Sequence, residues 1–430
     1  MTKRMFLVCV IMGLTAGWIS AQAQPAKVIA IRGAKIIPVV GDDIEGGTII
    51  IKDGKIEAVG KDVAIPSGAE VVEAKGLCAY PGMIDGYSFL GLQEISGVSA
   101  TVDNRETGRI NPQVRAIEAL RYDSMHIPIA RSNGITAALV APTGGLISGQ
   151  STLIKLDGWT NREMVIKSQA AMQIEFPGIR GGRGGFGGMG RGGAVTADAT
   201  RLIAELKELF KNARYYQKRK EFAAKNPAAA QPEFQETLEF ILPVVRGELT
   251  VMISVHSDQD IKAAIQFVKD ESLKAVFFGV EQGWKVADDL KKSNIPVIIS
   301  SLYDMPPVWD DGYDSLFRNP GVLNKAGVKI AFSSVSASVA KDLPYHAAKA
   351  AAFGLDKKEA LKAVTIYPAE IFGVDKIMGS LEKGKTANIV LSDGDILETR
   401  TNIKKVYIDG QETDMSNRYL ELLEKFKKRG

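Results

Sequence analysis

Three histidines are the residues of this chain best suited to bind a metal ion or to transfer a proton. His256 ends an apolar run from Glu248, which has the pattern of a buried strand. His126 follows a polar stretch, and His346 lies inside a predicted helix. Because a hydrolytic metal is usually held by several imidazoles and carboxylates, one well-placed histidine does not suffice. His256 is therefore predicted to be a catalytic base, a residual metal ligand or a hydrogen-bonded pocket histidine.

A second stretch whose side chains could take part in catalysis or binding runs from Tyr80 to Leu90. It has the pattern of a buried strand ending in a loop. Asp85 is predicted either to present a carboxylate at the mouth of a site or to have a capping or structural role. Tyr87 is predicted to act as a hydrogen-bond donor or general acid, or simply to fill space. Gln150, farther along, is another candidate for a pocket position.

Alternating strands and helices must position these side chains. Five apolar runs have the continuous pattern of parallel strands that are buried on both faces, namely 134–140, 248–256, 273–280, 295–300 and 327–333. Predicted helices lie between them at 258–269, 282–292 and 337–353, and Asp258 and Asp260 suit a helix start. Such βα units indicate a closed barrel or a doubly wound sheet.

Short strands occupy both ends of the chain. Between Val28 and Cys78 they are separated by tight turns, and Asp53-Gly54 predicts a two-residue hairpin. The strands near 387–391 and 405–410 have no helices between them, so we expect them to pair with the N-terminal strands. A charged amphipathic helix is predicted at 416–428.

Composition excludes some classes of protein. A formal net charge of +4 over 430 residues gives no support for a nucleic-acid-binding protein. The Arg-Gly-Gly run at 179–193 resembles RNA-binding tails, but within a barrel pattern it indicates a loop insertion. The cations between Lys211 and Lys220 indicate a solvated helix face.

The first residues have the features of a secretory signal. Lys3 and Arg4 precede an apolar run, and Ala21-Gln22-Ala23 suits a signal peptidase. A single transmembrane anchor is the alternative, although the run is short for it. We expect removal of residues 1–23, a secreted or periplasmic protein, and no membrane span after cleavage.

Four segments, in this order, resemble the amidohydrolase superfamily and its exported imidazolonepropionase-like branch. Tyr80 to Phe89 is similar to the family's first barrel strand, and Gly145 to Ser151 to the loop after its second. Val255-His256-Ser257 is similar to the fifth strand, and Gly379 to Val390 to the strand that returns to the small domain. The resemblance implies a (β/α)8 TIM-type barrel with a composite β-sandwich built from both chain ends.

The resemblance also implies where a catalytic zinc would be bound. In the family a His-x-His pair comes from the first strand, a Lys or Glu from the fourth, histidines from the fifth and sixth, and an Asp from the eighth. The matching positions here are Tyr87 and Phe89, then His256, Gly279 and Val335; the fourth-strand residue has no clear match. Aromatic and aliphatic side chains are not zinc ligands, so the metal site is expected to be degenerate.

We therefore expect a family member related to hydrolases of non-peptide C–N bonds in cyclic amides. It would be a catalytically reduced or inactive binding or partner subunit. The alternative is an active hydrolase of small amides with a rearranged site around His256. Expected partners are a small amide-type ligand, a second copy, or an intact relative, but not nucleic acid. The predicted segments are the signal at 1–23, sandwich strands at 24–78, a barrel at 79–378, sandwich strands at 379–415 and a helix at 416–430.

Overall fold

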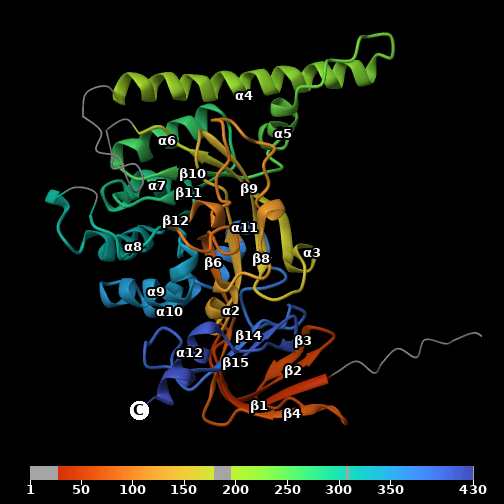
Figure 1. Ribbon diagram of the computed structural model, residues 1–430, viewed down its shortest axis with the longest axis vertical. Coiled ribbons are helices and arrows are strands. Elements are labelled where there is room, and N and C mark those ends of the chain that lie inside the picture. Colours follow the sequence, from red (N-terminus) through yellow and green to blue (C-terminus); the bar gives the residue numbers. More distant parts are fainter. Residues whose placement is uncertain (1–27, 179–194, 307–308, 430) are drawn as a thin grey trace, which may run out of the picture.

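The computed structural model describes residues 28–178, 195–306 and 309–429. A barrel occupies the middle of the molecule, a separate sheet lies at one end, and the long helix α4 (Val195–Lys225) crosses the other end (Figure 1). The predicted signal at 1–23 and the whole Arg-Gly-rich run at 179–193 lie outside the described residues. Within the described part of the chain, no helix has the length and apolar character needed to cross a membrane.

The barrel is an eight-stranded sheet whose first and last strands meet. A backbone bridge between Ser88 and Val335 joins its two edges, and the Phe89 amide donates to the Val335 carbonyl at 2.8 Å. The predicted TIM-type barrel is thus confirmed. In sheet order its strands are β6 (Met83–Ser88), β7 (Ile135–Val140), β8 (Ile147–Lys155), β9 (Val165–Glu175), β10 (Val251–Val255), β11 (Ala275–Gly279), β12 (Val297–Ile299) and β13 (Ile330–Phe332).

Strand β8 departs from the expected pattern. The segment from Gly145 to Ser151 was expected to be a loop, but all of it after Leu146 belongs to β8, which pairs antiparallel to both β7 and β9. Gly144 and Gly145 have φ angles of +92° and +72°, which favour glycine and reverse the chain. The connection from β7 is too short for the helical crossover that a parallel strand needs. The third strand of the barrel therefore runs against the others.

Helices cover the barrel unevenly. Several of them stack along the side formed by β10 to β13, whereas the side of β8 and β9 carries the single turn α3 (Figure 1). The α-helices other than α4 are α1 (Ala116–Ala119), α2 (His126–Arg131), α3 (Asn161–Met164), α5 (Glu236–Val245), α6 (Asp258–Asp270), α7 (Ala287–Ser293), α8 (Ser315–Ala326), α9 (Leu343–Ala352), α10 (Lys357–Lys362), α11 (Ile366–Phe372) and α12 (Arg418–Lys427).

Local sequence explains several of these elements. Helix α6 begins after Ser257, whose hydroxyl accepts the Asp260 amide at 3.2 Å, so the serine supplies the cap and the predicted aspartates add charge in the first turn. The barrel interior is filled by apolar side chains from alternate strands, among them Ile84, Met252 and Ile298, which are fully buried. The barrel is therefore a packed core with its chemistry confined to its ends.

The second sheet contains strands from both ends of the chain, as predicted. Hydrogen bonds join all of these strands into a single sheet. Strand β1 pairs with β2, β4 and β5, and β14 pairs with β5, so the two chain ends meet there. Asp53 and Gly54, with φ of 50° and 76°, form the predicted hairpin between β2 and β3. The strands are β1 (Val28–Ile36), β2 (Ile44–Lys52), β3 (Lys55–Gly60), β4 (Glu70–Glu73), β5 (Cys78–Pro81), β14 (Ile389–Ser392), β15 (Ile403–Ile408) and β16 (Gln411–Glu412). Because β5 ends at Pro81, the chain changes sheet at Gly82, slightly later than the expected boundary.

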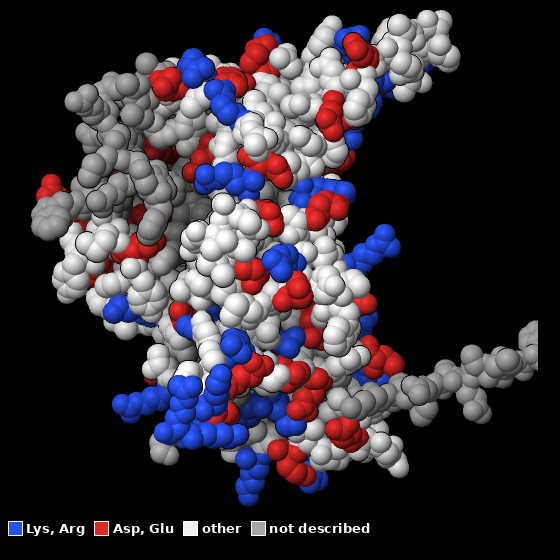
Figure 2. Space-filling model, in the orientation of Figure 1, with Lys and Arg blue, Asp and Glu red and all other residues white. Residues whose placement is uncertain are grey.

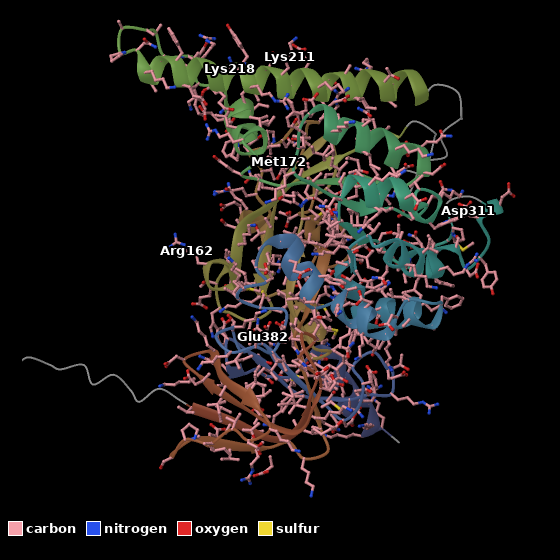
Figure 3. All side chains as sticks on the ribbon, turned by 180° about the vertical axis from the view of Figure 1, so that it is seen from behind. Arg162, Met172, Lys211, Lys218, Asp311 and Glu382 are labelled. Carbon is pink, nitrogen blue, oxygen red and sulfur yellow. The ribbon has the colours of Figure 1, made fainter. Side chains whose placement is uncertain are left out.

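Charges are distributed over the surface without one dominant patch on the barrel. Acidic and basic side chains are interspersed over the visible face, and the densest group of cations lies near the C-terminal end of the chain (Figure 2). Lys211 and Lys218 point outward from α4, away from the barrel, as a solvated helix face would (Figure 3).

Candidate functional site at the barrel mouth

A polar group lies where four neighbouring barrel strands end. His256 follows β10, and its Nδ1 is 2.8 Å from Oε2 of Glu281, which follows β11. Ser300, after β12, donates its hydroxyl to the other oxygen of Glu281 at 2.8 Å. On the opposite side, His256 Nε2 lies 3.9 Å from Oε1 of Glu175, the last residue of β9. The imidazole is thus held between two carboxylates.

The two carboxylates change the protonation of His256. Burial alone would lower the pKa of His256, but the nearby Glu281 carboxylate and then Glu175 raise it well above its usual value. For Glu281, burial acts to raise the pKa, and the charge and hydrogen bond of His256 outweigh it and lower the pKa. His256 lies at the barrel mouth with 51% of its side chain exposed, and its raised pKa favours the protonated form.

The backbone between β11 and Glu281 makes this arrangement feasible. Gly279 has φ +97°, and a Cβ atom built on it would lie 2.7 Å from the Val255 carbonyl oxygen and 3.0 Å from His256 Nδ1. Val280 follows at φ +57°, which is rare for a β-branched residue. This tight turn brings Glu281 back toward the imidazole. Gly279, the sixth-strand position predicted from the resemblance, thus has no side chain that would block His256. The contact with the imidazole comes from the carboxylate of Glu281, two residues later.

Gly279→Ala is expected to destabilise the fold by about 3 kcal/mol, because it adds a steric clash to the cost of a left-handed alanine. Gly384→Ala is the matched control: its φ is +88°, and nothing lies within 4 Å of the point where its Cβ would be. We expect that control to lose only about 1 kcal/mol. Chemical denaturation measures both, and an NMR titration of the Gly279 variant should show the pKa of His256 moving down. Equal losses in the two variants would contradict the steric account.

Aromatic rings occupy the centre of the mouth. Tyr87 stacks on Phe278 with ring centroids 4.1 Å apart, and Phe89 meets Tyr87 edge-on at 5.7 Å. Tyr87 is buried, and burial followed by the charge of Glu175 raises its pKa, so the phenol stays neutral. Val335 packs against the same group and has φ +62°. Tyr87, Phe89 and Val335 are thus brought together, and with Phe278 they fill the space between the strand ends.

Asp85 lies beneath these rings and is completely buried. Its carboxylate accepts the Ser334 amide at 2.9 Å, the Ser334 hydroxyl, and the Tyr87 amide at 3.3 Å. Burial raises its pKa to about 7 despite these hydrogen bonds. Asp85 therefore connects the first barrel strand to the turn after the eighth. Of its two predicted roles, this is the structural one.

The remaining candidates have partners other than His256. Gln150 is buried in β8 and donates its amide to the Pro112 carbonyl at 2.8 Å. His126 starts α2, and its Nε2 is 2.9 Å from the Glu94 carbonyl oxygen. His346 is buried in α9, and its Nδ1 accepts the Leu302 amide at 3.2 Å. These three side chains therefore serve the packing of other parts of the barrel.

The residues at the mouth do not fit a zinc ion of the family type. The positions held by Tyr87, Phe89, Gly279 and Val335 offer no imidazole or carboxylate, which leaves His256 at the end of the fifth strand and Glu175 at the end of the fourth. Glu175 and Glu281 both contact the imidazole itself. Among residues 28–178, 195–306 and 309–429, no three His, Cys, Asp or Glu side chains are arranged to hold a metal.

Sequence reasoning missed Glu175, Glu281 and Ser300. Glu175 ends the apolar run Ala170 to Ile174 just before Phe176-Pro177, a pattern that signals the end of a strand. Glu281 follows Gly279 by two residues, so counting carboxylates just beyond each strand end would have identified both glutamates. Ser300 offers no comparable signal, because serine is common after strands.

Comparison with known proteins adds three similarities. A family model described as "Amidohydrolase family" matches residues 313–413. Amidohydrolase tasK from Hapsidospora irregularis is 24% identical over 388 residues, covering 85% of this chain and 39% of that protein. An imidazolonepropionase from Caldanaerobacter subterraneus subsp. tengcongensis is 33% identical over 124 residues, covering 25% of this chain and 30% of that one.

A solved structure shares the fold over nearly its whole length. The amidohydrolase from Thermotoga maritima MSB8 superposes with a TM-score of 0.79 at 24% identity, covering 90% of this chain and 99% of that chain. Molinate hydrolase superposes with a TM-score of 0.55 at 16% identity, over 91% of this chain and 95% of that one. By contrast, this chain spans well under half the length of the two relatives matched by sequence.

Proposed function

The chain belongs to the amidohydrolase superfamily, and from this premise we propose that it is a metal-free member that serves as a binding or partner subunit. One observation carries the proposal: at the family's first-strand zinc position this chain has Tyr87, which stacks on Phe278, and its fifth-strand His256 is held between two carboxylates. These side chains provide no family-type set of ligands for the zinc that activates water in a hydrolase. The barrel remains as a rigid scaffold.

The partner would be an intact relative in the same compartment, or a second copy of this chain. The side of the barrel at β8 and β9 lacks large covering helices among the described residues, and Trp159 beside it is 85% exposed. The tasK relative extends far beyond the part that this chain matches, which suits a barrel that associates with further protein. We propose that such a complex lies outside the cytoplasm, in the periplasm or beyond the cell, because residues 1–23 have the features of a secretory signal.

Removing metals is expected to leave the protein unchanged. After treatment with EDTA the Tm should stay within about 1 °C of the untreated value, and added zinc should not raise it, because no bound ion stabilises the folded state. Differential scanning calorimetry measures both. A fall of more than about 5 °C that zinc reverses would overturn the proposal.

The contact between Glu281 and His256 favours a second candidate. A carboxylate that holds one imidazole nitrogen is the arrangement by which a histidine acts as general base, and the other nitrogen of His256 lies 3.9 Å from Glu175. The chain would then hydrolyse C–N bonds in small amides, with its rate rising with pH as His256 loses its proton. A panel of a hydantoin, a lactam and a dipeptide tests this candidate. Turnover that falls at least about 100-fold in His256→Ala supports it, and equal null rates reject it.

A further inference from the structure

A cavity lies at the same end of the barrel as His256, and its walls are formed by residues other than those around His256. Its volume is about 200 Å³, and its walls are the loop after β6 and the turn after β13. It is lined by Gln93, Glu94, Ile95, Ser96, Ser336 and Ser338. We call it the Glu94 cavity. None of the positions implied by the family resemblance lines it.

The Glu94 cavity is rich in hydrogen-bond acceptors. Its lining holds one carboxylate, one amide and three serine hydroxyls, and no Lys, Arg or His among the described residues. Oε1 of Glu94 is shielded from solvent and has no hydrogen-bond partner within the described part of the chain. The described lining thus carries a carboxylate and hydroxyls without a cation, and a cationic ligand would supply the missing charge.

Both walls of the cavity are held in place before any ligand binds. On one side the Thr101 hydroxyl contacts the Ile95 carbonyl at 3.0 Å and the Val98 carbonyl at 2.9 Å. On the other side the Ser336 amide donates to the Ser334 carbonyl at 2.8 Å, directly after Val335 with its positive φ. Backbone strain of this kind is often retained where it shapes a site. The side chains of Ser336 and Ser338 are 3.1 Å apart.

One apolar side chain lies among the acceptors. Ile95 lines the cavity and is 56% exposed. Val98 and Val339, on the same two loops, are also exposed. A ligand that suits both features has a cationic donor group and an apolar part.

We propose that the Glu94 cavity binds a small primary amine that carries an apolar substituent. The ammonium group has three N–H donors, which match the Glu94 carboxylate and the Ser336 and Ser338 hydroxyls. The apolar part lies against Ile95. This inference deepens the proposed binding role, on which it rests, by naming the class of ligand.

Titration of the purified full chain with 3-methylbutylamine tests the proposal. We expect saturable binding by isothermal titration calorimetry. The alcohol 3-methylbutan-1-ol has the same apolar part without the charge and should bind at least about tenfold more weakly. Methylamine, which lacks the apolar part, should also bind more weakly.

Variants assign the binding to this cavity. Glu94→Gln keeps the shape and removes the charge, and it should weaken amine binding at least about tenfold. Glu106→Gln, at an exposed glutamate that does not line the cavity, should leave it unchanged. The inference would be overturned by any of three results. Glu94→Gln could bind the amine as tightly as the natural chain does, the alcohol could bind as tightly as the amine, or the amine could show no saturable binding. If Glu94→Gln does not fold, the comparison of amine and alcohol on the natural chain still decides. Zinc retained by the purified protein would overturn the proposed metal-free function. It would not affect the amine titration, which tests the cavity alone.

Discussion

Asp85→Ala is expected to lower the free energy of unfolding by about 3 kcal/mol at pH 5, because it leaves the buried Ser334 and Tyr87 amides and the Ser334 hydroxyl without their acceptor. Asp85→Asn keeps one acceptor and should cost about 1 kcal/mol at the same pH. Chemical denaturation gives both values. Equal, small losses in the two variants would contradict the role of Asp85 as the connection between the ends of the barrel.

The same variants should reveal a dependence on pH. Burial raises the pKa of Asp85 from 3.8 to about 7, so between these values the unfolded chain releases a proton that the folded chain retains. The contribution of Asp85 to stability is therefore full below pH 3.8 and is lost as the pH rises through 7. Relative to Asp85→Asn, the natural protein should lose about 4 kcal/mol over this range. A difference that does not change with pH would rule out a raised pKa.

His346 should produce the opposite dependence. Burial lowers its pKa to about 4, although Asp342 acts in the other direction, and the neutral Nδ1 accepts the Leu302 amide. Between pH 6.5 and 4 the unfolded chain binds a proton that the folded chain does not, so stability falls as the pH falls. Relative to His346→Asn, whose amide oxygen can accept the same hydrogen bond, the natural protein should lose about 3 kcal/mol.

Because the two windows overlap and the signs are opposite, the natural protein should show little net change between pH 4 and 6.5 from these two groups. Denaturation of the three proteins across that range separates the contributions. If the natural protein and His346→Asn change in parallel as the pH falls, His346 does not titrate as described.

The sequence was most informative where a pattern has one physical meaning. Continuous apolar runs predicted the barrel strands, Asp53-Gly54 predicted a hairpin, and the strands near both ends predicted the composite sheet, all of which the structure contains. Strand β8 was missed because a run of nine residues after a glycine turn can be a loop or a strand until its pairing is known.

The site was only partly predictable. His256 was recognised because it ends a strand. Its contact with Glu281 depends on a turn with two successive positive φ angles, at Gly279 and Val280, whereas Glu175 was identifiable only from its place at the end of a strand. Asp85 was assigned two roles, and only its complete burial against Ser334 distinguishes them. The stacking of Tyr87 on Phe278 could not be predicted, since no sequence pattern relates the first strand to the sixth.

The central claim is that this barrel has exchanged a zinc site for an aromatic and imidazolium mouth. Elemental analysis of the purified chain by plasma mass spectrometry, after growth in zinc-supplemented medium and dialysis, tests it most directly. We expect less than about 0.1 zinc per chain, because within the described residues no set of neutral imidazoles and carboxylates surrounds a common point. About one zinc per chain retained through dialysis would contradict the claim.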